Sequence, residues 1–201
     1  MSEVDAAVRA IRAGELAVLP TDTVYGLACA PYRREPVRRL SDVKGRTPDQ
    51  PIAILAKSVD WLLECIPELR GRAALAARAL LPGPYTLVLP NPARRYPWLA
   101  AGRPDTLGVR VPELAGTGQA VLEEVGAVAA TSANLHGGAD PRRLEDVPEA
   151  IRSHAVVVDG GELPGTPSTV LDLCGDEPRV LREGAVPARE ALAAVEAALA
   201  E

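Results

Sequence analysis

The sequence lacks several features that would place it in a special class of protein. Its 201 residues include no phenylalanine, two tryptophans, four tyrosines and two histidines. No run of about 18 uncharged apolar residues occurs, so no membrane-spanning helix is expected. The segment from Met1 to Asp5 is acidic, where a secretory signal would be basic and then apolar. These absences predict a cytoplasmic protein that makes no contact with a membrane.

Cysteine is also scarce. Cys29, Cys65 and Cys174 are odd in number and far apart, with no CxxC pair. This pattern fits neither a disulfide framework nor a zinc site, and it favours a reducing compartment. His136 and His154 have no cysteine or histidine at ligand spacing, which makes a metal site built on them improbable. A cysteine nucleophile with a histidine base stays open as an alternative.

The overall composition is that of a folded protein. Apolar residues make up 47% of the chain and charged residues 24%, so the sequence can build a core. We expect one domain over residues 1–201. The net charge of −5 argues against a protein whose main task is to grip a nucleic acid backbone. Lys44 and Lys57 are the only lysines, and every other basic residue is arginine.

Apolar periodicity predicts helices and strands that alternate along the chain. Several expected strands are too close together for a helical crossover, so the prediction is an α/β domain with a mixed sheet and helices packed on it. Residues 24–30 are small and are assigned to neither class, and 44–48, 91–105 and 132–141 are expected loops. The expected helices are 3–13, 36–43, 59–65, 69–81, 117–125, 145–152 and 188–200. The expected strands are 16–19, 52–55, 85–89, 107–111, 127–131, 155–159, 169–173 and 180–181.

Polar and cationic residues gather at the ends of the expected strands. In open α/β sheets ligands bind in crevices at strand ends, so this placement predicts a site for a small, polar, anionic ligand. The sequence has neither a GxxxxGK[ST] phosphate loop nor a GxSxG elbow. Residue types alone therefore indicate a nucleotide- or phosphate-handling protein, although caps and turns would explain several of these residues equally well. The candidates are Thr21, Thr23, Lys44, Arg46, Arg110, Ser132, Asn134, Ser168 and Arg182.

Seven segments resemble the motifs of the YrdC/Sua5 family. The first, Pro20-Thr21-Asp22-Thr23-Val24-Tyr25-Gly26-Leu27, resembles the family's PT[ED]TVYGL. The others follow in the family's order between about residues 16 and 186. They are Lys44-Gly45-Arg46, Pro82-Gly83-Pro84-Tyr85-Thr86, Gly108-Val109-Arg110-Val111-Pro112, Thr131-Ser132-Ala133-Asn134-Leu135, Ser168-Thr169-Val170 and Leu181-Arg182-Glu183-Gly184.

The resemblance implies a twisted, open α/β sheet with a concave, positively charged face. It also implies a threonylcarbamoyl-AMP synthase, a nucleotidyltransferase that converts L-threonine, bicarbonate or CO₂, and ATP into threonylcarbamoyl-AMP and pyrophosphate. Mg²⁺ would accompany ATP, with no metal ligand from the protein. The product would pass to a tRNA threonylcarbamoyl transferase complex that modifies adenosine 37, and weak direct contact with tRNA would be compatible with this role.

The resemblance also suggests a role for each candidate residue. Lys44 and Arg46 would be catalytic and would bind the triphosphate. Ser132, Asn134 and Arg182 would complete the ATP site. Threonine would contact Thr21, Thr23 and Ser168, with Arg110 near its carboxylate.

Departures from the family pattern keep rival readings open. Leu55 stands where some members have a polar residue, and the segment from Gly137 to Arg142 replaces a stretch that usually ends in Ser or Thr. The main rival is a YciO-like paralogue that binds nucleotide or RNA without this activity. A second rival is RNA binding, against which the net charge of −5 and the scarcity of lysine argue. A third is the carbamoyl-transfer module of hydrogenase-maturation proteins, which would need neighbouring acylphosphatase and zinc-finger segments that are not expected in this sequence. The chain resembles the single-domain bacterial form, without the further domain of longer Sua5 proteins.

Overall fold

The computed structural model describes residues 2–46 and 50–200. The helices are α1 (Glu3–Ala13), α2 (Arg34–Lys44), α3 (Val59–Cys65), α4 (Arg72–Leu80), α5 (Gly116–Val125), α6 (Glu149–Arg152) and α7 (Ala188–Ala200), with short 3-10 turns η1 (Pro97–Leu99) and η2 (Leu144–Asp146). The strands are β1 (Leu16–Pro20), β2 (Tyr25–Cys29), β3 (Ala53–Ala56), β4 (Tyr85–Pro90), β5 (Thr106–Arg110), β6 (Ala127–Ser132), β7 (Ala155–Val157), β8 (Thr169–Asp172) and β9 (Arg179–Arg182). No helix within these ranges is long and apolar enough to cross a membrane.

The described strands form a nine-stranded sheet in the order β7-β1-β2-β6-β3-β5-β4-β8-β9. The pairs β1–β7, β3–β5 and β4–β8 are parallel. The pairs β1–β2, β2–β6, β3–β6, β4–β5 and β8–β9 are antiparallel. The predicted mixed α/β sheet is therefore confirmed. Strand β6 joins the two halves of the sheet, because it lies between β2 and β3.

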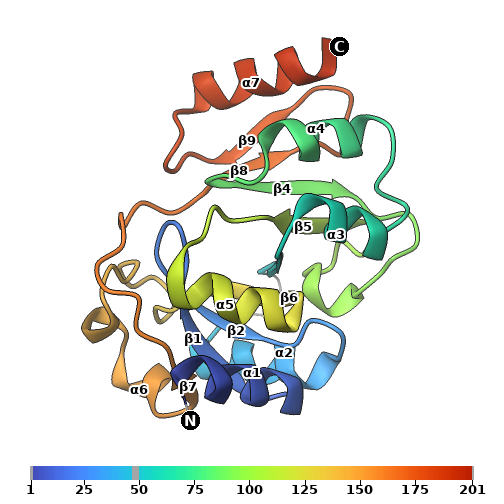
Figure 1. Cartoon of the computed structure of the whole chain (residues 1–201). Coiled ribbons are helices and arrows are strands. Elements are labelled where there is room, and N and C mark those ends of the chain that lie inside the picture. Colours follow the sequence, from blue (N-terminus) through green and yellow to red (C-terminus); the bar gives the residue numbers. More distant parts are fainter. Residues whose placement is uncertain (1, 47–49, 201) are drawn as a thin grey trace.

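Helices α1 and α5 pack against each other on one face of the sheet (Figure 1). Their apolar residues Val8, Ile11 and Val121 form a core with side chains of β1, β2 and β6. The sequence sets the ends of α1. Ser2 and Asp5 form a capping box at its start, and Gly14 adopts the left-handed conformation at its end.

The larger core lies on the opposite face, where α2, α3, α4, α6 and α7 contribute buried side chains. Along β4, Leu87 and Leu89 belong to this core, while Thr86 and Val88 face the other way. Strand β5 alternates in the same manner. On the face that carries Thr86 and Val88, α1 and α5 pack over residues of β7, β1, β2 and β6 and over Leu55 of β3. The rest of this face, over β3, β5, β4 and β8 and the end of β6, is left open as a cavity.

Several boundaries differ from the sequence-based expectations. Residues 24–30 contain β2, which is buried along its whole length and so shows no polar alternation. The expected helix 145–152 is divided into η2 and α6, because Pro148 cannot continue a helix and precedes α6. Helix α2 ends at Lys44, one residue later than expected, and is capped by Gly45. Residues 47 and 48 of the expected 44–48 loop lie outside the described residues.

Candidate functional site

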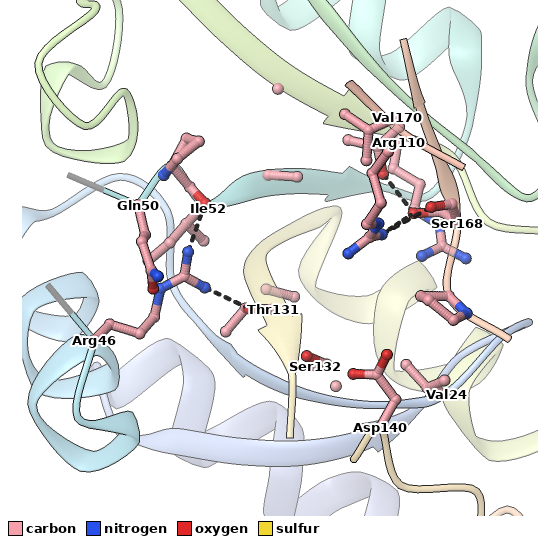
Figure 2. Close-up of a pocket in the computed structure, with 18 of the residues that line it drawn as sticks. Val24, Arg46, Gln50, Ile52, Arg110, Thr131, Ser132, Asp140, Ser168 and Val170 are labelled. Atoms are coloured by element: carbon pink, nitrogen blue, oxygen red, sulfur yellow. Dashed lines mark hydrogen bonds between the residues drawn. The ribbon is translucent and has the colours of Figure 1, made fainter. Parts of the chain in front are cut away.

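The open part of the sheet forms a cavity of about 730 Å³. Figure 2 shows Arg46, Gln50 and Ile52 on one side of it, Arg110, Ser168 and Val170 on the other, and Ser132 and Asp140 between them. Small residues of β3 and β5, Ala53 and Gly108, line it and leave room for a ligand. All nine candidate residues predicted from the sequence border this cavity: Thr21, Thr23, Lys44, Arg46, Arg110, Ser132, Asn134, Ser168 and Arg182. Their individual roles remain predictions.

The turn between β1 and β2 places Thr21 and Thr23 at the cavity. Thr21 Oγ1 donates to the carbonyl of Val24 at 2.7 Å and accepts the backbone N–H of Thr23 at 3.2 Å. The two hydroxyl oxygens lie 3.1 Å apart. The start of β2 is anchored by the buried Tyr25, whose hydroxyl oxygen lies 2.9 Å from both Asp159 Oδ1 and the carbonyl of Gly161 and has one proton to donate between them. The turn is therefore held by its own side chains.

Lys44 is buried beneath the loop that follows β6. Its Nζ donates to the carbonyl of Ser132 at 2.5 Å, the carbonyl of Asn134 at 2.8 Å and Asn134 Oδ1 at 2.5 Å. These three acceptors use all three protons of the ammonium group. Ser132 Oγ also donates to Asn134 Oδ1 at 2.7 Å. Lys44 thus fixes the shape of the segment that carries two other candidate residues.

The charge of Lys44 is sensitive to its surroundings. Burial and the nearby Arg46 lower the pKa of Lys44 to about 8, and the carboxylate of Asp140 opposes that shift. Asp140 is also within 3.3 Å of Asn134 Nδ2. Among the described residues that line the cavity, Asp140 is the sole acidic one, while Lys44, Arg46, Arg103, Arg110 and Arg182 are basic. The wall of the cavity therefore carries an excess of positive charge, although the chain as a whole is acidic.

Arg46 crosses from the end of α2 to β6. Its Nη1 donates to Thr131 Oγ1 at 2.6 Å and its Nη2 to the carbonyl of Pro51 at 2.9 Å. Its Nε is buried and has no hydrogen-bond partner among the described residues. Gly45, in the left-handed conformation with φ 65°, turns the chain so that Lys44 and Arg46 both reach the cavity.

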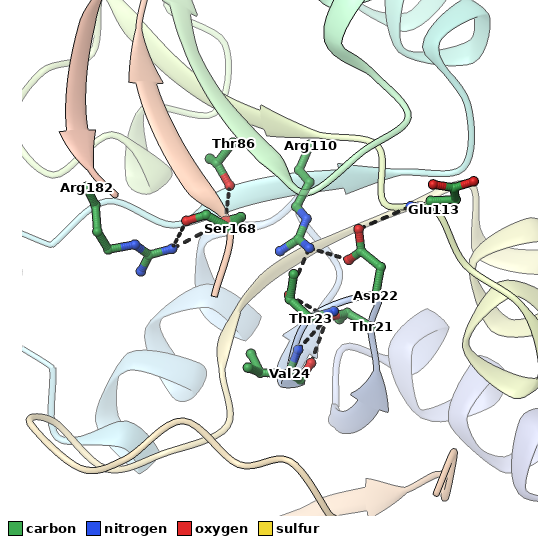
Figure 3. Close-up of polar contacts among 9 residues, drawn as sticks. All are labelled: Thr21, Asp22, Thr23, Val24, Thr86, Arg110, Glu113, Ser168 and Arg182. Carbon is green, nitrogen blue, oxygen red and sulfur yellow. Dashed lines mark hydrogen bonds and ion pairs between the residues drawn. The ribbon is translucent and has the colours of Figure 1, made fainter. Parts of the chain in front are cut away.

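Ser168 and Arg182 meet at the opposite end of the cavity. Arg182 Nη2 donates to the carbonyl of Ser168 at 2.8 Å, and Ser168 Oγ lies 2.9 Å from Thr86 Oγ1. Arg110 reaches the same region from β5 and contacts Asp22 and Thr23 (Figure 3). The first set of contacts joins β8 to β9 and β4, and the second joins β5 to the turn after β1.

Sequence reasoning missed several residues of this site. Thr86 and Thr131 lie inside two of the matched motifs, so the motifs themselves offered a signal for them. Asp140 and Arg103 stood in predicted loops, Gln50 stood in a stretch that was assigned to no element, and none of the three carried such a signal. Gln50 Nε2 and His136 Nδ1, 3.2 Å apart, link the segment after α2 to the segment after β6.

Two departures from the family pattern have clear positions. Leu55 lines the cavity with an apolar surface. Arg142 points instead toward the linker between β7 and β8, where its Nη2 donates to Glu162 at 2.9 Å. Neither residue brings a charge to the described cavity wall.

The cysteine alternative finds no support in the cavity. None of the three cysteines belongs to the described residues that line it. Burial raises the pKa of Cys29 to about 12, which suppresses the thiolate that a nucleophile needs. His136, which does border the cavity, therefore has no cysteine beside it there.

The donor set has a consequence for metal binding. Within residues 2–46 and 50–200, no group of three or more His, Cys, Asp or Glu side chains could hold a metal ion. Mg²⁺ in nucleotide-using proteins is often bound by one or two carboxylates together with phosphates and waters. The single carboxylate of Asp140 therefore fits an ion that arrives with a nucleotide better than one held by the protein alone.

Comparison with known proteins places this fold and cavity in context. A family model for Sua5, YciO and YrdC proteins, described as "Telomere recombination", matches residues 9–184. The chain belongs to the Sua5/YciO/YrdC family. Its membership agrees with the motif resemblance.

Members of the Sua5/YciO/YrdC family with assigned names match most of the chain. The threonylcarbamoyl-AMP synthase of Pyrococcus abyssi is 35% identical over 182 residues, covering 90% of this chain and 53% of that protein. A solved structure of P. abyssi Sua5 complexed with L-threonine has a TM-score of 0.86 and 33% identity, covering 96% of this chain and 58% of that one. The chain thus spans little more than half the length of these relatives.

A second branch of the Sua5/YciO/YrdC family is also similar. The crystal structure of Escherichia coli YciO has a TM-score of 0.79 and 26% identity, covering 94% of this chain and 92% of that one. The overall fold is therefore similar to solved structures of both branches, and the fold alone does not separate them.

Proposed function

We propose that this chain is a threonylcarbamoyl-AMP synthase, which joins L-threonine, bicarbonate or CO₂, and ATP and releases pyrophosphate. The observation that carries the proposal is the convergence on one cavity of nine residues spread between Thr21 and Arg182. The names of the P. abyssi relatives supply the reaction and one substrate, threonine. A volume of about 730 Å³ also lies within the range of small-molecule sites.

The proposed chemistry asks for positioning and positive charge. The ammonium group of threonine loses a proton to give the free amine, the amine nitrogen adds to CO₂, and the nitrogen releases a second proton to solvent as the carbamate forms. A carbamate oxygen then attacks the α-phosphorus of ATP, the bond from that phosphorus to the bridging oxygen of the β-phosphate breaks, and pyrophosphate leaves. Such an in-line displacement needs no covalent enzyme nucleophile. A cavity with several cations and hydroxyls and no described cysteine suits this reaction.

Lys44 and Arg46 are proposed to bind the triphosphate side of ATP. Because the protons of Lys44 are donated to Ser132 and Asn134, Lys44 would act through its charge and through the loop that it holds. Arg46, anchored by Thr131, would present its guanidinium to the phosphates. Preorganised charge of this kind stabilises the charge that develops on the leaving pyrophosphate.

The remaining candidates are proposed to hold the nucleotide and the amino acid. Arg182 would contact a phosphate or the adenine side, with Ser132 and Asn134 completing the ATP site. Thr21, Thr23 and Ser168 would orient threonine, and Arg110 would lie near its carboxylate. Mg²⁺, when bound with ATP, would neutralise phosphate charge, and Asp140 is the cavity carboxylate that could approach it.

The pKa of Lys44 leads to a pH prediction. Since that pKa is about 8, the ammonium loses its charge as the pH rises through 8, whereas an exposed lysine stays charged to about 10.5. The dissociation constant for a nonhydrolysable ATP analogue, measured by calorimetry without threonine, should therefore increase above pH 8. A Lys57→Ala variant should show the same increase of the dissociation constant, with a midpoint near pH 8, and a Lys44→Ala variant should not show it. A wild-type affinity that is constant to pH 10 would contradict the assignment.

The same shift predicts the direction of a stability change. Between pH 8 and 10.5 the unfolded chain binds more protons at Lys44 than the folded chain, so the contribution of this group to stability rises with pH in that window.

Pyrophosphate release tests the proposed activity most directly. The wild-type protein with ATP and Mg²⁺ should release pyrophosphate when L-threonine and bicarbonate are both present, and only a background amount when either is withheld. Pyrophosphate release that does not depend on threonine or on bicarbonate would overturn the proposal. Nucleotide binding without release would favour the alternative that the similarity to YciO raises, a paralogue that uses the cavity differently.

The reactivity of the proposed product indicates what kind of partner would receive it. A mixed anhydride of a carbamate and AMP is a reactive acyl donor, so it would be passed promptly to an acceptor. We propose that a tRNA threonylcarbamoyl transferase complex receives it for adenosine 37, and that any direct contact of this chain with tRNA is weak, given its net charge of −5.

A further inference from the structure

We propose that Asp22 is a positioning residue, whose buried carboxylate holds Arg110 in the orientation that the active site needs. The proposal rests on the function proposed above and adds to it a residue that does not border the cavity: Thr21, Thr23 and Val24 are among its lining residues and Asp22 is not. Asp22 would act through Arg110, which does border it.

Asp22 contacts both Arg110 and the backbone of the segment that follows β5. Asp22 Oδ1 pairs with Arg110 Nη2, and Asp22 Oδ2 accepts the backbone N–H of Glu113 at 3.2 Å. The same Nη2 donates to Thr23 Oγ1 at 2.9 Å. The side chains of Asp22 and Arg110 are only 9% and 8% exposed, so water screens their attraction little. One end of the guanidinium is therefore immobilised by the turn after β1.

The other end of Arg110 remains available to a ligand. Its Nε is buried without a hydrogen-bond partner among the described residues. Figure 3 shows the second terminal nitrogen directed away from Asp22, on the side where Ser168 lies. Because the Nε is closed to solvent, the second terminal nitrogen, with its two N–H groups, is the part of Arg110 that can donate to a ligand carboxylate in the cavity.

Charge compensation gives Asp22 a second effect. Burial lowers the pKa of Arg110, the carboxylate of Asp22 opposes that shift, and the charge of Arg182 adds a smaller lowering, so the two guanidinium groups repel each other weakly. Asp22 offsets one of the two positive charges. The one remaining positive charge matches a ligand group with a single negative charge, such as the carboxylate of an amino acid. Without Asp22, Arg110 would be both unanchored and repelled by Arg182.

Threonine binding tests this proposal separately from turnover. Titration calorimetry with L-threonine, in the presence of a nonhydrolysable ATP analogue, gives a dissociation constant for each variant. We expect Asp22→Asn to raise it by about 30-fold while the affinity for the ATP analogue changes by less than about threefold. Asp22→Glu keeps the charge and should restore most of the threonine affinity. Asp60→Asn, which removes an exposed carboxylate paired with Arg78, is the matched control and should change neither constant.

A double variant distinguishes positioning from a general loss of structure. If Asp22 acts through Arg110, Asp22→Asn should have no further effect on threonine affinity in an Arg110→Met background. That double variant also leaves no unpaired buried charge, so it provides a folded reference even if Asp22→Asn alone unfolds. Equal losses from Asp22→Asn in both backgrounds, or unchanged threonine affinity in Asp22→Asn, would overturn the proposal. Failure of the wild type to bind threonine would instead overturn the proposed function.

Discussion

Replacement of Lys44 by alanine is expected to lower kcat for pyrophosphate release by about 10²–10³-fold. The variant loses a buried positive charge from the cavity wall, and it also leaves the oxygens of Ser132 and Asn134 without their shared donor. Both the phosphate charge and the loop that carries two site residues would then be unsupported. Steady-state pyrophosphate release with saturating ATP, threonine and bicarbonate measures the loss.

The chain contains its own control for this experiment. Lys57 is the other lysine, and it lies outside the cavity, 3.5 Å from Glu123. Lys57→Ala should therefore retain wild-type kcat. Circular dichroism of Lys44→Ala should show a folded protein, and Arg46→Ala should lose turnover to a similar degree. Normal activity in Lys44→Ala would contradict the role proposed for this residue.

Replacement of Gly184 by alanine is expected to damage both stability and activity. A Cβ atom at Gly184 would lie 2.2 Å from the carbonyl oxygen of Pro167 and 2.6 Å from that of Ser168. These are backbone atoms, which cannot change rotamer to relieve the clash as a flexible side chain can. The segment that carries Ser168 would therefore have to move away from β9. The contact between Arg182 and Ser168 would be lost with it.

Urea unfolding and pyrophosphate release measure the two consequences at Gly184. We expect Gly184→Ala to lower the free energy of unfolding by about 1–3 kcal/mol and to reduce activity in the fraction that remains folded. Gly175→Ala is the comparison, because the nearest atom to its Cβ would be 3.9 Å away. An unfolding midpoint equal to that of the wild type in Gly184→Ala would show that the two segments are not packed as described.

Much of the fold was predictable because the sequence signals were local. The capping box of α1, the glycine that ends it and the β-branched and aromatic residues of β4 are signals that depend on neighbouring residues only. The strand β2 was missed because it is buried on both faces and has no alternation to detect. Pro148 is a local signal that the helix expected over 145–152 is interrupted, and the structure has the break at that residue.

The functional site, like the fold, was predictable only in part from the sequence. The motif resemblance identified nine candidate residues, and in the structure all nine border one cavity. It did not indicate which side chains pair. Asp22 and Arg110 are 88 positions apart, as are Lys44 and Ser132, and only the sheet brings them together. Spacing along a sequence carries no information about such contacts until the strand order is known.

The central place of β6 has a consequence for how the protein is made. The strands β7, β1 and β2 share no ladder with β3, β5, β4, β8 and β9 except through β6. A nascent chain therefore cannot join its N-terminal hairpin to the rest of the sheet before residue 132 has left the ribosome. The binding cavity also needs Ser168 and Arg182, so ligand could promote only the last stage of folding. We expect slow, cooperative folding dominated by contacts between distant parts of the chain, with threonine and nucleotide protecting the completed structure rather than guiding its early steps.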